Sequence, residues 1–155
     1  MNRLSKSNKP LEAHLIGLNN KIKDNSYTAI TDEIEIMVWP EFIDSQIGAL
    51  GNLFIWAYHV RIENRSALGV KLLNRHWKII DEQGVLQEVD GPGVLGEQPQ
   101  IASGSAFQYS SGVHLRYPSG IMSGHYQLQK DNGDLFDAKI PAFSLDVPTI
   151  KSVVN

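Results

Sequence analysis

Residues 122–140 read MSGHYQLQKDNGDLFDAKI. Near the middle stands the pair Asn132-Gly133, and an Asn-Gly pair between two alternating segments is the strongest short signal for a β-hairpin. Residues 122–129 before the pair fit a strand. After the pair, apolar side chains recur at every second position, as in a strand with one buried face: Phe136, Ala138 and Ile140. The stretch therefore predicts two antiparallel strands joined by a turn.

The same two-residue period recurs on both sides of this hairpin. Residues 32–40 and 54–62 place apolar side chains at every second position, and the opposite face of 54–62 is polar in its second half. The first of these strands closes on a proline that ends it or lies at a sheet edge. Residues 70–81 form a longer strand that returns at 85–89 after the turn Asp81–Gly84. Further short strands are predicted at 106–110, 113–117 and 143–147. About eight strands without a second helical pattern predict an all-β domain, a sandwich or a barrel.

Residues 1–26 differ from the rest of the chain. They carry five Lys or Arg against two acids, a charge of +3, whereas residues 27–155 carry nine against fifteen, a charge of −6. Residues 1–9 are polar, and the apolar residues that follow share one face of a short helix: Leu11, Leu15, Leu18 and Ile22. We predict a flexible or partly helical N-terminal extension over 1–26 and one β-sandwich domain over 27–155. The extension touches an anionic partner or is a solvated tail, and the second interpretation is favoured.

The composition excludes several classes of protein. The chain has no cysteine, so it has no disulfide, thiolate zinc site, iron–sulfur cluster or cysteine nucleophile. No apolar run reaches the ~18–20 residues of a membrane span, and no signal peptide is recognisable, so we predict a cytoplasmic protein without a membrane span. The acidic body argues against a nucleic-acid partner, because such partners bind basic faces.

Residues 91–96 (GPGVLG) match the pattern G-x-G-x-x-G. In a dinucleotide-binding fold this turn opens a helix whose N-terminal amides hold the pyrophosphate, but here Glu97-Gln98-Pro99 follows and no helix is predicted. A weaker possibility is an anion or pyrophosphate site made by the backbone amides around Gly91, Gly93 and Gly96. The favoured interpretation is that these glycines let the loop adopt positive φ and pack close to a strand.

The segment Arg75-His76-Trp77 is unusual for a strand. Alternation places Trp77 and Arg75 on one face of the sheet and His76 on the other. Arg and Trp dominate interface hot spots, which indicates a recognition surface formed with Glu97 and Gln98 of the glycine loop. The alternative is a buried Trp77 whose neighbours are paired for structural reasons, and both interpretations remain open.

No spacing in the sequence indicates a metal site or a catalytic group. The five histidines are scattered, without the H-E-x-x-H pattern: His14, His59, His76, His114 and His125. Carboxylates flank one predicted hairpin, as Mg²⁺ would require, but they form no EF-hand loop: Asp81, Glu82, Glu88 and Asp90. No G-x-S-x-G motif supports a serine nucleophile, so we predict no catalytic residue, no metal ligand and no cofactor.

At this point the motifs resemble those of the ApaG family, in order and from about Tyr27 to the C-terminus. The motifs are Pro40, Ser45, Tyr58, Ile62-x-Asn64, Arg75-His76-Trp77, Gly91-x-Gly93-Val94-x-Gly96-Glu97-Gln98-Pro99, Phe107-x-Tyr109-x-Ser111-Gly112, Pro118-x-Gly120-x-Met122-x-Gly124-x-Tyr126 and Ile140-Pro141-x-Phe143-x-Leu145. Leu95 and Ser110 stand where Val and Thr are commoner in the family. The resemblance implies a fibronectin type III-like or immunoglobulin-like β-sandwich. It also implies a link to cobalt and magnesium efflux, protein contacts like those of the domain in F-box and polymerase-interacting proteins, and a pyrophosphate site at the glycine motif.

Three functions follow as hypotheses. The first is a non-enzymatic protein-interaction module with an unknown protein partner and an indirect role in Co/Mg homeostasis. Exposed sheet edges would allow such a module to pair as a homodimer. The second is a binder of pyrophosphate-containing nucleotides through the loop Gly91–Gly96. The third is a divalent-cation binder whose His and carboxylate ligands are gathered by the fold. An enzyme ranks below all three.

Overall fold

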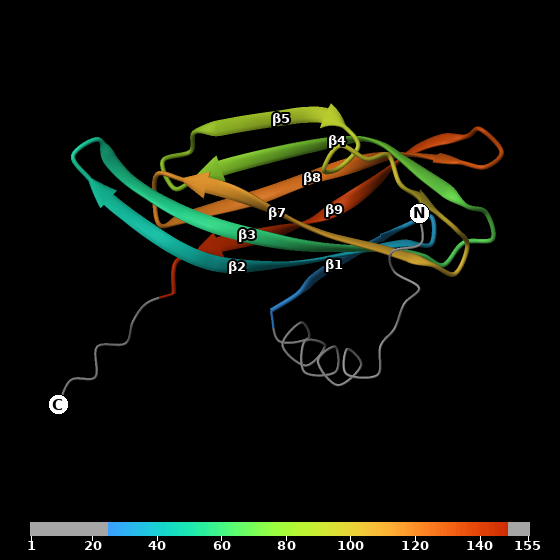
Figure 1. Ribbon diagram of the computed structural model, residues 1–155, viewed down its shortest axis with the longest axis horizontal. Helices are drawn as coiled ribbons and strands as arrows, with labels where there is room; N and C mark the ends of the chain where they lie inside the picture. The colour runs from blue at the N-terminus through green and yellow to red at the C-terminus, as the bar shows by residue number, and fades with distance from the viewer. Residues whose placement is uncertain (1–24, 149–155) are drawn as a thin grey trace.

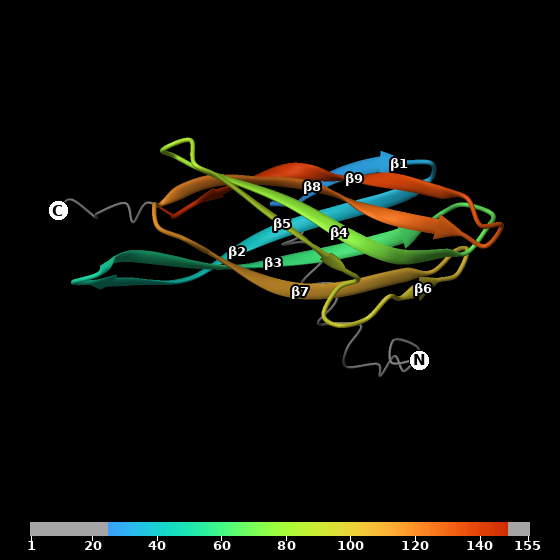
Figure 2. The ribbon, with the colours of Figure 1, turned by 90° about the horizontal axis from the view of Figure 1, so that it is seen from above.

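The computed structural model describes residues 25–148, and the helix expected within the N-terminal extension lies outside these residues. Two antiparallel sheets face each other, as Figures 1 and 2 show. Sheet A has the strand order β1 (Tyr27–Thr31), β2 (Ile34–Gly48), β3 (Gly51–Asn64) and β7 (Ala106–Leu115). Sheet B has the order β5 (Leu86–Pro92), β4 (Val70–Asp81), β8 (Ser119–Lys130) and β9 (Leu135–Asp146), with β6 (Gln100–Ile101) paired to β4. The predicted β-sandwich is confirmed.

The hairpin that decided the fold is present as β8 and β9. Gln129 pairs with Leu135, and Gly133 has a φ of 94°, a conformation that glycine adopts without strain. The turn at Gly84 is likewise present, with a φ of 79°. Pro40 was expected either to end its strand or to lie at a sheet edge. It lies within β2, and the pairing of β1 with β2 stops at Val38, so Pro40 is at a sheet edge.

Two predicted strand breaks are wrong. Residues 106–117 were expected as two strands, but Ala106–Leu115 is one continuous strand. Residues 136–147 were expected as two strands separated by Pro141, but β9 runs through this proline. The register of β9 against β8 shifts between Met122 and Gly124, and this bulge accommodates the proline at the sheet edge. Two short strands, β1 and β6, were not predicted, because each shows too few alternating positions to give a pattern.

Aromatic side chains from both sheets meet in the core. The Trp77 ring of β4 lies 5.1 Å from Tyr58 of β3, 6.3 Å from Tyr126 and 6.0 Å from Phe143, measured between ring centroids. All three contacts are edge-to-face, the arrangement that aromatic quadrupoles favour. Trp77 therefore links the inner faces of the two sheets. Within residues 25–148 no helix has the length and apolarity needed to cross a membrane.

The far halves of β2 and β3 extend beyond sheet B as a two-stranded arm, visible in Figures 1 and 2. Ile47 and Leu50 at its end are exposed. A register shift between Phe42 and Asp44 marks the base of the arm, and such bulges bend a strand and increase its twist.

The turn between β1 and β2 offers a simple gain in stability. Asp32 (φ 46°) and Glu33 (φ 62°) both have left-handed backbones, which cost a residue with a Cβ about 1–2 kcal/mol. We expect Glu33→Gly to raise the free energy of unfolding by about 0.5–1 kcal/mol, since glycine loses part of this gain through its greater entropy in the unfolded chain. Urea unfolding monitored by tryptophan fluorescence measures the change. Thr28→Gly in β1, at an ordinary φ, should lower stability, and a loss in both variants would contradict the argument.

Candidate functional site

The face of sheet B turned away from sheet A carries His76, one of the residues that the sequence singled out, among polar and charged neighbours. Outward-facing positions of β4 lie at Asn74, His76, Lys78 and Ile80, and pairing aligns each with neighbours on β5 and β8. The resulting rows are Leu86–Ile80–Ile121, Glu88–Lys78–Ser123, Asp90–His76–His125–Lys139 and Pro92–Asn74–Gln127–Asp137. Along this outer face the rows change from apolar to mixed and polar.

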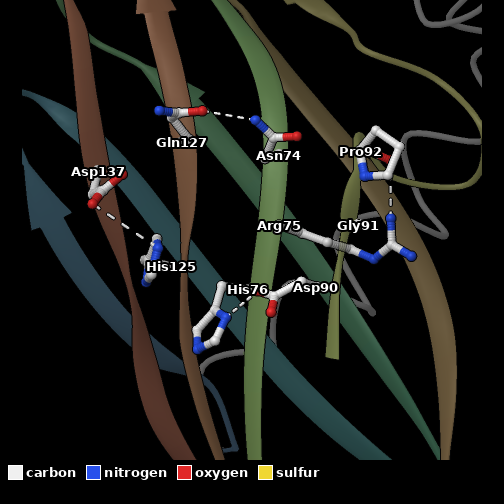
Figure 3. Close-up of a pocket in the computed structure, with 9 residues that line it drawn as sticks. All are labelled: Asn74, Arg75, His76, Asp90, Gly91, Pro92, His125, Gln127 and Asp137. Atoms are coloured by element: carbon white, nitrogen blue, oxygen red, sulfur yellow. Dashed lines mark hydrogen bonds and ion pairs between the residues drawn. The ribbon is translucent and has the colours of Figure 1, made fainter. Parts of the chain in front are cut away.

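Two histidines lie side by side in the third row. The rings of His76 and His125 stack with centroids 5.0 Å apart at 28°. The Nδ1 atom of His76 bonds the carboxylate of Asp90, and the Nε2 atom of His125 lies 3.9 Å from Asp137 Oδ2 (Figure 3). The hydrogen bond to Asp90 orients the imidazole of His76, whereas Asp137 lies within ion-pair distance of His125 without a hydrogen bond. The sequence could not show this pair, since His76 and His125 are far apart along the chain.

Two hollows share these histidines. The larger encloses about 520 Å³, and Figure 3 shows the side chains around it. Its lining includes Asp90 and Asp137 with the amides of Asn74 and Gln127, which bond each other (Nδ2 to Oε1, 2.7 Å). The smaller hollow encloses about 250 Å³ and is lined by His76, Lys78, Ser123, Gly124, His125, Lys139 and Ile140.

The glycine loop is held by Arg75. Its Nη1 atom donates to the carbonyl oxygens of Pro92 (3.0 Å) and Gly93 (2.9 Å). A Cβ on Gly91 would lie 2.8 Å from Arg75 Nη2, so glycine leaves room for the guanidinium. Arg75 and Gly91, predicted to belong to separate sites, are therefore brought together at the rim of the larger hollow.

The remainder of the glycine motif is a tight turn. Val94 and Glu97 exchange backbone hydrogen bonds of 2.8 and 3.0 Å, and the two residues between them, Leu95 and Gly96, have φ of 50° and 75°. Positive φ at both central positions is typical of a type I′ hairpin turn. The N–H of Gly93 donates to Leu73 O at 2.8 Å. The amides of Gly93, Val94 and Glu97 are therefore already paired within the protein, and the pyrophosphate site at Gly91, Gly93 and Gly96 stays a prediction.

The other predicted interaction residues separate in space. Trp77 is 2% exposed and lies in the core, while Arg75 shares its side of β4 and His76 faces outward, as alternation predicted. A buried indole is not accessible to a partner, so this placement favours the structural interpretation of Trp77. Glu97 and Gln98 are exposed on the loop and line neither hollow. The side-chain amide of Gln98 donates to Leu73 O at 2.9 Å, a bond that fixes the loop.

Three tyrosines share a buried polar cluster next to Arg75. The hydroxyl groups of Tyr109 and Tyr126 bond each other. Burial raises the pKa of both phenols, and burial also raises the pKa of Tyr58. The three side chains are therefore neutral at ordinary pH, and the cluster is a packed hydrogen-bonding element of the core rather than a set of acids and bases.

The outer face of sheet A carries a serine–histidine–glutamate arrangement. His59 Nδ1 lies 2.6 Å from Ser110 Oγ, and its Nε2 lies 2.9 Å from Glu41 Oε2. No sequence motif indicates this arrangement, because the three residues come from three different strands. Ser110 and Glu41 are exposed, Ser110 lies within a strand, and neither hollow includes it. Acyl transfer needs placed oxyanion donors and shelter from water, so we assign these residues no catalytic role.

Comparison with known proteins agrees with these motifs. The family model described as "ApaG domain" matches residues 45–130. A Protein ApaG of Methylocella silvestris is 51% identical over 129 residues, which cover 83% of this chain and 99% of that relative. The chain belongs to the ApaG domain family. A Protein ApaG of Rhizobium leguminosarum is 46% identical over 129 residues, with the same coverage. An X-ray structure of a Northeast Structural Genomics Consortium target matches with a TM-score of 0.75 at 35% identity, covering 82% of this chain and 96% of that one.

The resemblance to the ApaG family seen in the sequence is thereby confirmed. The likeness to fibronectin type III or immunoglobulin domains stays a prediction. Within residues 25–148, no three His, Asp or Glu side chains are grouped so that they could hold a metal ion.

Proposed function

We propose that this ApaG-domain protein is a non-enzymatic interaction module that binds another polypeptide on the outer face of sheet B. The observation that supports the proposal is the row Leu86–Ile80–Ile121, which crosses three neighbouring strands in register. These side chains are 50%, 41% and 49% exposed, and Val85 beside them is also exposed. Single exposed apolar residues are normal on a surface, whereas a contiguous group marks a contact site.

The surroundings of this apolar row resemble the rim of an interface. The next row along β4 is Glu88–Lys78–Ser123, and the histidine row follows. Specific protein interfaces combine an apolar centre with a polar rim of this kind. β5 lies at the edge of sheet B, so a partner segment can also add main-chain hydrogen bonds there.

The predicted role in cation homeostasis and the possible pairing of two copies of this chain both depend on which protein binds the outer face. The family resemblance implies an indirect role in cobalt and magnesium homeostasis, and an interaction module would exert such a role through the protein that it binds. A second copy of this chain is one alternative occupant of the outer face, and the measurement below separates it from a different protein.

We expect the double variant Ile80→Ser/Ile121→Ser to bind the partner at least about tenfold more weakly, because each isoleucine contributes roughly 1.5–3 kcal/mol when fully buried. Tagged full-length chain would capture the partner from lysate of the source organism, and titration calorimetry with the purified partner would give the Kd. Both isoleucines face away from the core, so circular dichroism should show an unchanged fold.

The matched control is Ile47→Ser/Leu50→Ser at the end of the β2–β3 arm, which removes the same kind of exposed side chain from sheet A instead of sheet B. It should leave the Kd unchanged. Loss of binding in this arm variant and not in the sheet B variant would place the contact on the arm and overturn the proposal. Sedimentation of the purified chain tests whether a second copy occupies the outer face. A dimer of the unmodified chain that is lost in the Ile80→Ser/Ile121→Ser variant would identify a second copy as the occupant.

A further inference from the structure

We infer, resting on the proposed function, that the bound polypeptide places a carboxylate side chain in the smaller hollow of the outer face, next to an aliphatic side chain on the apolar row. The hollow lies immediately beside that row, since Lys78 and Ser123 are two residues along β4 and β8 from Ile80 and Ile121. One partner segment can therefore reach both.

The lining of the smaller hollow suits an anion. It contains two lysines, Lys78 and Lys139, together with the hydroxyl of Ser123 and the two histidines, and no carboxylate. Among residues 25–148 no carboxylate oxygen lies within 4.0 Å of either lysine ammonium. Two cations with a hydroxyl donor in one hollow are a suitable setting for charge-assisted hydrogen bonds to a carboxylate.

The charged residues that line the two hollows are divided by the histidine pair, while Glu88, opposite Lys78 in the register, lines neither hollow. Asp90 and Asp137 line only the larger hollow, and Lys78 and Lys139 line only the smaller. The two carboxylates also contact His76 and His125, on the side of the larger hollow. A ligand carboxylate is therefore attracted to one hollow and repelled from the other, which fixes its position on the face.

The ligand is a single anionic group rather than a polyanion. Residues 27–155 have a formal charge of −6, from nine basic against fifteen acidic residues. A nucleic acid would be repelled by this net negative charge along its whole length, whereas a single carboxylate interacts mainly with the nearby lysines. The outer face thus suits an isolated Asp or Glu within an otherwise apolar segment.

The register sets the spacing of the recognised sequence. Ile80 and Lys78 are two residues apart on one face of β4, a separation of roughly 6.6 Å along a strand. An extended partner segment repeats its side chains with the same period. The recognised pattern is therefore an aliphatic residue and an Asp or Glu two positions apart.

A peptide-display selection tests this inference with a random-peptide library and the immobilised full-length chain, discarding peptides that also bind the Ile80→Ser/Ile121→Ser variant. We expect enrichment of an aliphatic residue two positions from Asp or Glu. A synthetic peptide of the enriched sequence should bind Lys78→Gln/Lys139→Gln at least about tenfold more weakly, as measured by fluorescence anisotropy. Lys71→Gln, at an exposed β4 position that lines neither hollow, is the matched control and should change nothing.

The other outcomes separate the two proposals. Enriched peptides without an acidic residue would overturn the inference and leave the interaction module intact. Peptides with Arg or Lys in place of the acidic residue would also overturn it, and would indicate binding at the larger hollow beside Asp90 and Asp137. Full affinity for the double lysine variant would also overturn it. A selection with no peptide dependent on Ile80 and Ile121 would count against the interaction module itself.

Discussion

Replacing Gly124 with alanine should destabilise the fold by about 3 kcal/mol or more, at the upper end of what overpacking costs. Gly124 pairs with Trp77 at the centre of sheet B. A Cβ at this position would lie 2.0 Å from His76 O and 3.2 Å from Trp77 Cα. Both atoms belong to the backbone of β4, so the clash cannot be relieved by rotating a side chain. Guanidinium unfolding monitored by tryptophan fluorescence gives the free energy.

Gly112→Ala is the matched control for this substitution. Gly112 also lies within a paired strand, β7, but its nearest neighbour for a Cβ is Trp56 O at 3.4 Å, an ordinary contact. We expect a change within about 0.5 kcal/mol. Equal stability of the two alanine variants would show that β4 and β8 can separate at this point without loss of packing.

Replacing Trp77 with alanine should cost about 3–5 kcal/mol, as expected for deletion of a buried tryptophan. Its ring contacts Tyr58, Tyr126 and Phe143, and these contacts join the two sheets. The loss should appear as a lower denaturation midpoint with an unchanged slope. Any loss of partner binding should follow the unfolded fraction and disappear under conditions in which the variant is folded.

Trp77→Phe separates packing from polarity at the same site. The Trp77 Nε1 atom is buried without a hydrogen-bond partner among the described residues. Phenylalanine keeps an aromatic ring and removes this unpaired donor, which costs about 1–3 kcal/mol when buried. We therefore expect Trp77→Phe to lose less than half of what Trp77→Ala loses. A Trp77→Ala variant with normal stability and no partner binding would restore Trp77 as a recognition residue.

The strands themselves could be predicted because one buried face imposes a period of two on the sequence. Ile34, Ile36 and Val38 show this period, and all three are buried in the structure. The turn at Asn132-Gly133 was equally clear, because few residues tolerate the backbone that Gly133 adopts. The breaks at residues 111–112 and Pro141 were wrongly predicted because polar or cyclic residues within a strand interrupt the pattern without interrupting the pairing.

The candidate site could be predicted only in part. Arg75, His76 and Gly91 were singled out one strand at a time, and they do lie at or beside the hollows. His125 was named only as one of five scattered histidines, and Lys139 and Ile121 were not named. Their place beside β4 depends on the register between strands far apart in the sequence. A single sequence fixes which residues share a face of one strand, but not which residues of the next strand stand opposite them.

The pairing of β3 with β7 has a consequence for synthesis on the ribosome. Phe54 pairs with Leu115 and Glu63 with Ala106, so β3 needs a partner that is made only after β4, β5 and β6. About 50 residues separate the end of β3 from the end of β7, an interval of roughly 2–10 seconds at ordinary elongation rates. During that interval one edge of β3 is open to any other strand in reach. The nascent chain is thus most exposed to mispairing midway through translation, and slower elongation across β4–β6 lengthens that exposure.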